Sequence, residues 1–358
     1  RSHSHYLAGA GCASSGRGPL FARSGSNAGL DAPSSSSRSY STGAPPEPIN
    51  FGKDFYIARP PSEAFALETL NPHPLDKSLS FDEKSHTYYA HDGKNSEQGA
   101  DTGGGAPLRT SVTAIVDRFF DKFDPDLAIE RMMNGPNWPR PEYQHKQDGR
   151  PFTPEEIKRQ WDGIGTYARN RGTWMHYNIE RHLNNLAPTQ ALPELKLYLD
   201  FERDVMRPRN IEPWRTEWRI ADKDRSIGGS VDFVGKLSDG TYALMDWKRS
   251  KNLENALYNS YGRKARWPIS HIDDNEASKY FLQLNLYRLI IQQHYGLEIS
   301  LMVLSSFHPQ GASYFSLEVP IWEEEAQAVL DEHVQQMEQQ MQAPPGIGPI
   351  EPALPSSP

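Results

Sequence analysis

Alternating apolar and polar positions predict two neighbouring strands near the middle of the chain, over residues 228–237 and 242–248. The polar segment between them contains Asp-Gly, and this arrangement predicts a β-hairpin. The second strand is apolar until it reaches Asp246 and Lys248. Because side chains two positions apart share one face of a strand, we expect these two charged groups to be neighbours.

The direction of Asp232, on the first strand, depends on the length of the hairpin loop. A two-residue loop would place Asp232 opposite Trp247 and turn it away from Asp246. A three-residue loop, Ser238–Gly240, with Gly240 in the left-handed region, would place Asp232 across from Asp246. We predict the three-residue loop, because two carboxylates and a lysine on one face at a strand end form a site for a divalent metal ion such as Mg²⁺. An Asp and a Lys two apart also occur on ordinary solvated faces, so this pair alone does not define a metal site.

The spacing of apolar residues predicts helices on either side of these strands. Between Gly172 and Asn184, apolar residues recur every three or four positions and mark a buried stripe. Other helices begin at N-cap residues or end at a glycine, and other strands show β-rich alternation. We therefore predict an α/β fold in which helices flank a central mixed sheet of roughly four to six strands. The further helices cover 111–120, a start at 153–156, 193–207, 276–295 and 322–342, and the further strands cover 81–89, 215–220, 299–306 and 313–319.

His176 and Glu180 lie four residues apart, next to the buried stripe of the 172–184 helix. A histidine at such a position is often a structural residue held by hydrogen bonds. If the helix packs on the sheet, however, His176 would lie over Asp232 and Asp246 and complete a His/Asp/Asp site. Glu217 is a further acidic residue, and we expect it to face outward from its strand.

The chain becomes basic after residue 247, and aromatic residues are interleaved with the basic ones. This mixture suits a nucleic-acid strand, because its phosphates need neutralising and its bases stack on rings. A solvated loop is the alternative interpretation. The basic residues are Lys248, Arg249, Lys251, Arg263, Lys264 and Arg266, and the aromatic ones are Tyr258, Tyr261 and Trp267.

Composition limits the class of protein. The 358 residues carry a formal charge of −8, so the acidic body would need a local basic channel to hold nucleic acid. A hydrophobic content of 37% is enough for a core in one large domain or two small ones. No apolar run approaches the ~20 residues of a membrane helix, so we expect a soluble protein without a membrane partner. Cys12 is the single cysteine, which excludes Cys-ligated zinc and iron–sulfur clusters.

Residues 1–48 differ from the rest, being rich in Ser, Gly, Ala and Pro, with four arginines against two acidic residues. This composition is typical of an organellar transit peptide, and Arg38–Ser41 resembles the Arg-x-Tyr-Ser site of the mitochondrial processing peptidase. We therefore predict a mitochondrial location, with a plastid or the nucleus as alternatives. A generic disordered tail is the other interpretation of the segment. Cleavage after Tyr40 would remove four arginines and one aspartate and change the formal charge from −8 to −11.

The remainder of the chain is expected to form a single domain over residues 49–343, with its core at about 165–320. The Pro-rich end, residues 344–358, is expected to be a disordered tail. Between these limits, residues 95–107 contain three consecutive glycines and are interpreted as a flexible insertion.

Four short motifs occur in an order and context that resemble those of RecB-type nucleases of the PD-(D/E)XK superfamily. The resemblance covers about residues 80–320, and each motif is weak when taken alone. It implies a restriction-endonuclease-like core, a Mg²⁺ or Mn²⁺ cofactor and hydrolysis of DNA phosphodiester bonds. The motifs are Gly172-Thr173-x-x-His176-x-x-x-Glu180, Gly229-x-x-Asp232, Asp246-Trp247-Lys248 and Gln283-x-x-x-Tyr287.

The resemblance also implies a role for each matched residue. His176, Asp232 and Asp246 would bind the metal, with the Trp247 carbonyl nearby; Lys248 would act on the attacking water, Glu180 would support the site, and Gln283 and Tyr287 would place the nucleic acid.

The chain departs from the resembled family at three points. Val231 precedes Asp232 where the superfamily name has Pro. The four cysteines that hold an iron–sulfur cluster in some relatives are absent, and so is a helicase P-loop. A single-strand exonuclease is therefore the leading expectation. The alternatives are a structure-specific endonuclease of the same superfamily and a non-catalytic DNA-binding protein that keeps the fold.

Overall fold

The computed structural model describes residues 65–82, 85–91, 105–189, 191–251, 253–258 and 262–342. The predicted leader, the Pro-rich tail, Tyr261 and most of the predicted glycine-rich insertion lie outside these ranges. Among the described helices, none is long and apolar enough to cross a membrane.

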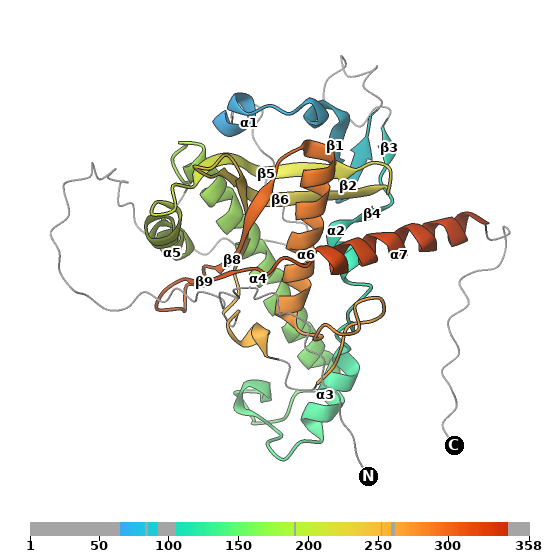
Figure 1. Ribbon diagram of the computed structural model, residues 1–358. Helices are drawn as coiled ribbons and strands as arrows, with labels where there is room; N and C mark the ends of the chain where they lie inside the picture. Colours follow the sequence, from blue (N-terminus) through green and yellow to red (C-terminus); the bar gives the residue numbers. More distant parts are fainter. Residues whose placement is uncertain are drawn as a thin grey trace, which may run out of the picture.

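The protein has a mixed α/β architecture around a central six-stranded mixed sheet, which agrees with the predicted fold class (Figure 1). Strands β5 to β9 follow one another across the sheet, and β4 lies beside the beginning of β6. The β4–β6 and β7–β8 pairs are parallel and the others antiparallel. The strands are β4 (Thr110–Ser111), β5 (Glu212–Asp222), β6 (Ile227–Lys236), β7 (Tyr242–Lys248), β8 (Ile299–Ser306) and β9 (Phe315–Glu318).

A smaller antiparallel sheet consists of β1 (Leu79–Asp82), β2 (Thr87–Ala90) and β3 (Ala106–Pro107). It lies next to the central sheet through contacts between β1 and β5. The side chain of Tyr88, on β2, also covers Gly228 of β6. A Cβ atom at Gly228 would be 2.5 Å from Cγ of that ring, so the close approach requires glycine.

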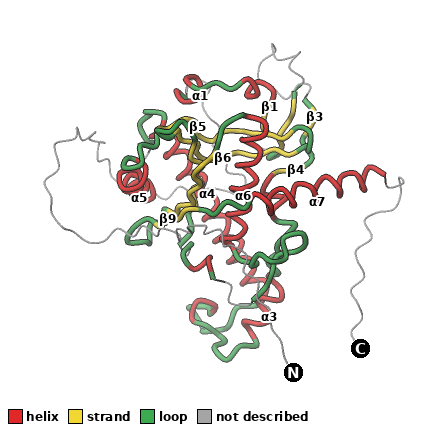
Figure 2. The backbone as a smooth tube through the Cα atoms, in the orientation of Figure 1, coloured by secondary structure: helices red, strands yellow, loops and turns green. Residues whose placement is uncertain are grey.

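Helices cover both faces of the central sheet (Figures 1 and 2). On one face, α6 packs over Leu244 and Leu304; on the other, α4 and α5 pack over Met245 and Trp247. Strands β6 and β7 are therefore buried on both sides, and the strand alternation serves two separate cores. The helices are α1 (Ala66–Leu70), α2 (Val112–Val116), α3 (Pro125–Met133), α4 (Pro154–Leu183), α5 (Pro193–Phe201), α6 (Glu276–Ile290) and α7 (Glu323–Gln342).

Helix α4 begins at the predicted capping box. The Thr153 hydroxyl accepts from Glu156 N, and the Glu156 carboxylate accepts from Thr153 N. The sequence suggested a new helix near Gly172, but α4 runs without a break through three glycines for 30 residues. Each internal glycine costs roughly 1 kcal/mol relative to alanine. The cap at one end and the buried stripe around Met175 and Ile179 at the other offset this cost.

The predicted three-residue hairpin loop is confirmed. Leu237 N donates to Thr241 O over 2.8 Å, and Gly240 has a φ of +90°. The register then pairs Phe233 with Met245. The next residues, Asp232 and Asp246, consequently face each other across the two strands, as the three-residue loop requires.

A buried ion pair fixes β5 to the segment before β1. Asp76 accepts hydrogen bonds from Arg215 Nη1, Trp218 Nε1 and His73 N, each over 2.8 Å. The side chain of Arg215 is only 5% exposed. Burial alone would raise the pKa of Asp76, but these donors hold that pKa below its ordinary value of 3.8.

Replacing Asp76 with Asn should lower the free energy of unfolding by about 3 kcal/mol, because it leaves the buried guanidinium of Arg215 without a countercharge. Urea denaturation of the wild type and the variant at pH 7 measures the difference. Glu68→Gln, an exposed change in the neighbouring helix α1, is the control and should have little effect.

The stabilisation by Asp76 should also depend on pH in one direction. A carboxyl whose pKa is lower in the folded protein contributes stability above its unfolded pKa, here near 3.8, and loses it as the pH falls further. The difference in free energy of unfolding between the wild type and Asp76→Asn should therefore become smaller below about pH 4. A gap that widens on acidification would contradict this reading of the ion pair.

Candidate metal centre

The hydrogen-bonded ladder between β6 and β7 stops one residue before the two predicted carboxylates. Phe233 and Met245 form its last pair, and the next bonded pair would use the backbone N–H and C=O of Trp247. Instead, Trp247 N donates to Oδ2 of Asp232 over 2.7 Å. The carbonyl of Trp247 accepts from Nε2 of His176 over 3.0 Å. Two side chains thus satisfy the backbone groups that the ladder leaves unpaired.

His176, from α4, faces two carboxylates with its other ring nitrogen. Nδ1 lies 3.2 Å from Oε1 of Glu217 and 3.5 Å from Oδ1 of Asp232. Because Nε2 donates to the Trp247 carbonyl, Nδ1 is the nitrogen that can bind a metal ion. A carbonyl that fixes the ring in this way is a common support for a metal-binding histidine. The Trp247 carbonyl, which the resemblance placed beside the metal, is engaged with the ring.

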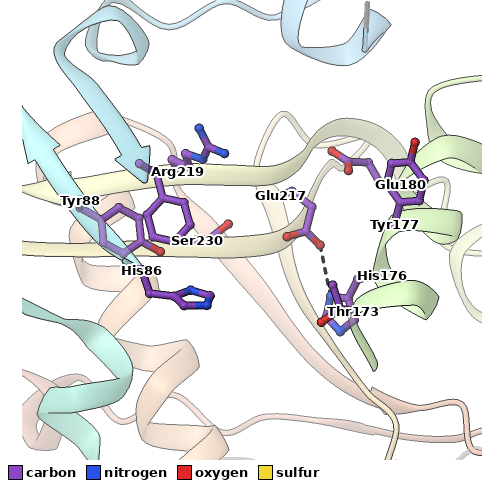
Figure 3. Close-up of a pocket in the computed structure, with 10 residues that line it drawn as sticks. His86, Tyr88, Thr173, His176, Tyr177, Glu180, Glu217, Arg219 and Ser230 are labelled. Atoms are coloured by element: carbon purple, nitrogen blue, oxygen red, sulfur yellow. Dashed lines mark hydrogen bonds and ion pairs between the residues drawn. The ribbon is translucent and has the colours of Figure 1, made fainter. Parts of the chain in front are cut away.

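The structure corrects the expectation that Glu217 faces outward. β5 pairs with β6 on both sides of this residue, but Glu217 itself has a φ of +44°. This left-handed conformation costs roughly 1–3 kcal/mol for a residue other than glycine. It turns the carboxylate toward His176 (Figure 3). The alternation of residues in β5 does not reveal such a local distortion, so the sequence pattern missed this member of the cluster.

Asp246 and Lys248 lie beside this cluster on β7. Nζ of Lys248 is 2.7 Å from Oδ2 of Asp246 and 4.7 Å from the ring centroid of Tyr280 on α6. Within the described ranges, Oδ2 of Asp246 is a buried oxygen with this ion pair but no hydrogen bond of good geometry. A buried carboxylate oxygen with spare acceptor capacity is suited to a cation.

The charges of the site shift the pKa values of its members. Burial raises the pKa of Asp232, and the nearby carboxylates of Asp246 and Glu217 raise it further. Burial alone would lower the pKa of His176, but Asp232 and Glu217 raise it. Likewise, Asp246 and Asp232 outweigh the burial of Lys248 and raise its pKa, so its ammonium is protonated at neutral pH.

Three residues offer donor atoms at a spacing that fits one cation: His176, Glu217 and Asp232, whose atoms all lie within 4.8 Å of one another. A small inward movement would bring them to the ~2.1 Å ligand distance of Mg²⁺. One imidazole and two carboxylates also suit Mn²⁺. The cluster shares His176 and Asp232 with the predicted ligands and contains Glu217 where the prediction had Asp246. Asp246 is adjacent and carries the ion pair with Lys248.

The predicted residues on the surrounding helices make hydrogen bonds with groups outside the cluster. Glu180 is 4% exposed, and its Oε1 accepts from the Thr216 hydroxyl over 3.5 Å. Gln283 Nε2 donates to the Tyr287 hydroxyl over 3.3 Å. Tyr287 is 4% exposed and packs over Gly229, so its ring lies in the core.

The predicted basic residues lie in different environments. The side chain of Arg249 is 9% exposed, with Nε 2.8 Å from the buried Glu194. Lys251 is exposed. Lys264 pairs with Asp273 over 2.6 Å, and Arg266 pairs with Asp121 over 3.3 Å.

Arg263 and Arg266 line a cleft of about 1090 Å³ between α3 and the beginning of α6. The cleft has mixed charge, and the exposed ring of Phe123 lies at its wall. The other cations that line it are Lys122, Arg131 and Lys279, and the acidic residues are Asp121, Asp124, Asp274 and Glu276. Of the predicted basic residues, these two arginines are the ones that the structure gathers at a common concave surface.

Glu217→Gln should weaken Mn²⁺ binding at least tenfold, since it removes one negative ligand while keeping the size of the side chain. Isothermal titration with MnCl₂ measures this. Glu212→Gln, an exposed change on the same strand, is the matched control. Equal affinities of the two variants for Mn²⁺ would show that Glu217 is not a metal ligand.

Metal affinity should rise with pH, because the cation must displace a proton from His176 Nδ1 and compete with protonation of Asp232. The pKa values of His176 and Asp232 are both raised, so protonation of these groups competes with the cation near neutral pH. Binding of Mn²⁺ should weaken by about tenfold for each displaced proton and each pH unit between about pH 8 and pH 6. Titrations in buffers of different ionisation enthalpy report the released protons. A pH-independent affinity would contradict the arrangement.

Comparison with known proteins adds little to this geometry. No protein-family model matches the sequence, and no curated protein matches it. Among solved structures, the chain is similar to one described as "Crystal structure of SSO0001", with 11% sequence identity over 67% of this chain and 79% of that chain. The TM-score is 0.24, a value at which the likeness carries no argument.

Proposed function

We propose that the protein is a metal-dependent nuclease that hydrolyses DNA phosphodiester bonds, with single-stranded ends as its preferred substrate. The observation that carries the proposal is the convergence of His176, Glu217 and Asp232 beside the Asp246–Lys248 ion pair. Two carboxylates, an imidazole and an ammonium at one strand end are the groups that phosphoryl transfer needs. The sequence resemblance to RecB-type nucleases of the PD-(D/E)XK superfamily points to the same chemistry.

Each residue has a role that follows from its contacts. His176, Glu217 and Asp232 would hold the cation, and Asp246 can join them through its buried Oδ2. A bound Mg²⁺ or Mn²⁺ would polarise the phosphate and lower the pKa of a water. Since Lys248 is protonated, its ammonium orients the attacking water and stabilises negative charge that develops on the phosphate.

The site's supports keep these groups in position. The Trp247 backbone orients both His176 and Asp232, and the ring of Tyr280 lies beside the Lys248 ammonium. A metal site whose residues are held by such further contacts is less free to reorganise during the reaction.

The transit-like leader and the motifs together suggest a mitochondrial enzyme similar to the mitochondrial genome maintenance exonuclease.

The distribution of charge indicates which part of the protein would hold the DNA strand. The chain is acidic overall, so the strand would be held locally, by cations such as Arg263 and Arg266 in the cleft of mixed charge. Base stacking on the exposed rings of Phe123 and Trp267 suits an unpaired strand.

Asp246→Asn and Lys248→Gln should each reduce cleavage of a labelled single-stranded oligonucleotide by at least about a hundredfold, because each removes charge that stabilises the transition state. Lys236→Gln, an exposed change on the same hairpin, should retain activity. Wild-type cleavage should require Mg²⁺ or Mn²⁺ and stop with EDTA.

Two outcomes would change the proposal. Undiminished cleavage by either site variant would refute the assigned roles, and DNA binding without cleavage by the wild type would favour a non-catalytic DNA-binding protein. Digestion of circular single strands as fast as of linear ones would identify an endonuclease of the same superfamily.

A further inference from the structure

The ammonium of Lys248 lies between two neighbours of different kinds. Nζ is 2.7 Å from Oδ2 of Asp246, on the same strand, and it lies over the ring of Tyr280, on α6, at 4.7 Å from the ring centroid. The side chain of Lys248 is still 22% exposed, so these neighbours hold it without enclosing it. A carboxylate and the face of an aromatic ring both attract a cation, but only the carboxylate is also a ligand for Mg²⁺.

Asp246 is the neighbour that metal binding would draw away. Its buried Oδ2 faces Lys248 in this structure, and in the proposed reaction the same oxygen can join the cation. A carboxylate bound to a divalent cation attracts an ammonium less, and the cation itself repels that ammonium. Because lysine has a flexible four-carbon stem, the ammonium would then leave the site unless a second contact retained it.

The ring of Tyr280 is fixed well enough to provide this second contact. Its hydroxyl donates to Oε1 of Glu276, one turn earlier on α6, over 2.5 Å. The ring is half-buried and packs against the core cluster that contains Leu244. A hydroxyl that donates to a carboxylate also leaves its ring richer in electrons, which strengthens the attraction of the ring face for a cation.

We propose that Tyr280 is a positioning residue, which keeps the Lys248 ammonium in the site once the carboxylate of Asp246 turns to the metal ion. The proposal rests on the proposed nuclease function and adds a residue to it that none of the four sequence motifs contains. A ring face is a poor ligand for Mg²⁺ or Mn²⁺, so the metal ion does not compete with Lys248 for this contact. The ammonium therefore stays beside the phosphate under attack while Asp246 changes partner.

Two substitutions separate the ring face from the hydroxyl. Tyr280→Leu removes the ring, whereas Tyr280→Phe keeps the ring face and loses the bond to Glu276. With saturating Mg²⁺ and a labelled single-stranded oligonucleotide, Tyr280→Leu should lower kcat about tenfold and leave KM within about twofold of the wild type. Tyr280→Phe should keep at least about a third of the wild-type kcat.

The matched control is Tyr242→Leu, which removes another half-buried tyrosine ring, at the opposite end of β7. It should keep the wild-type kcat and KM. Isothermal titration with MnCl₂ should give one affinity for the wild type and all three variants, because neither tyrosine is a metal ligand. Lost metal binding is thereby separated from a misplaced lysine.

Nuclear magnetic resonance gives a readout that does not depend on cleavage. The full chain is labelled with ¹³C at the ε-carbon of lysine, and Lys248→Gln identifies the signal of Lys248. Protons above a ring face resonate upfield, so this signal should lie upfield of the ordinary lysine range in the wild type and in Tyr280→Phe. It should stay there in Asp246→Asn, which removes the countercharge, and return to the ordinary range in Tyr280→Leu.

Three results would overturn the proposal: equal kcat for Tyr280→Leu and Tyr242→Leu, a Tyr280→Phe variant as slow as Tyr280→Leu, or a Lys248 signal that moves to the ordinary range in Asp246→Asn. If the wild type cleaves nothing, the nuclease proposal fails. The Lys248 signal in Asp246→Asn and Tyr280→Leu then still decides whether the ring alone holds the ammonium.

Discussion

The separation of β6 and β7 after the Phe233–Met245 pair is the feature on which the candidate site depends. An unpaired backbone N–H and C=O at Trp247 would be costly in this buried region. Asp232 and His176 satisfy them, so the same two side chains end the β6–β7 ladder and belong to the cluster. Backbone hydrogen bonding thus fixes two candidate ligands before any cation binds, and the unusual backbone of Glu217 adds the third. The left-handed backbone of Glu217 costs free energy, which binding of a divalent cation would offset.

Most of the fold could be predicted from the sequence, because capping residues, apolar spacing and turn residues indicate the same structure in its strongest helices and strands. Capping residues and apolar spacing located α4 at its start and α6 along its length, and Gly240 determined the hairpin register. That register places Asp232 across from Asp246, which no periodicity argument alone could decide. The continuity of α4 through Gly172 was missed, because intrinsic propensity penalises glycine while the packing that offsets it comes from distant residues.

The site was predicted in part, and the missing part has a structural cause. His176, Asp232, Asp246 and Lys248 were selected by motif and face, and they do gather at one strand end. Glu217 was not, since a left-handed residue within a strand contradicts the alternation by which outward and inward positions are assigned. Arg249 was selected for nucleic-acid binding because its neighbours in the sequence are basic. In the structure it pairs instead with the buried Glu194, 55 residues earlier. Long-range partners of charged residues are not visible in local sequence.

We propose that one cation binds between the imidazole of His176 and the carboxylates of Glu217 and Asp232. Anomalous diffraction from a crystal soaked in MnCl₂ would locate this cation. We expect a manganese peak within ligand distance of His176 Nδ1, with Nε2 still bonded to the Trp247 carbonyl and the Asp246 carboxylate alongside. A crystal with manganese elsewhere but none at this position, or with the His176 ring on the other side of the sheet from Asp246, would refute the proposed metal centre.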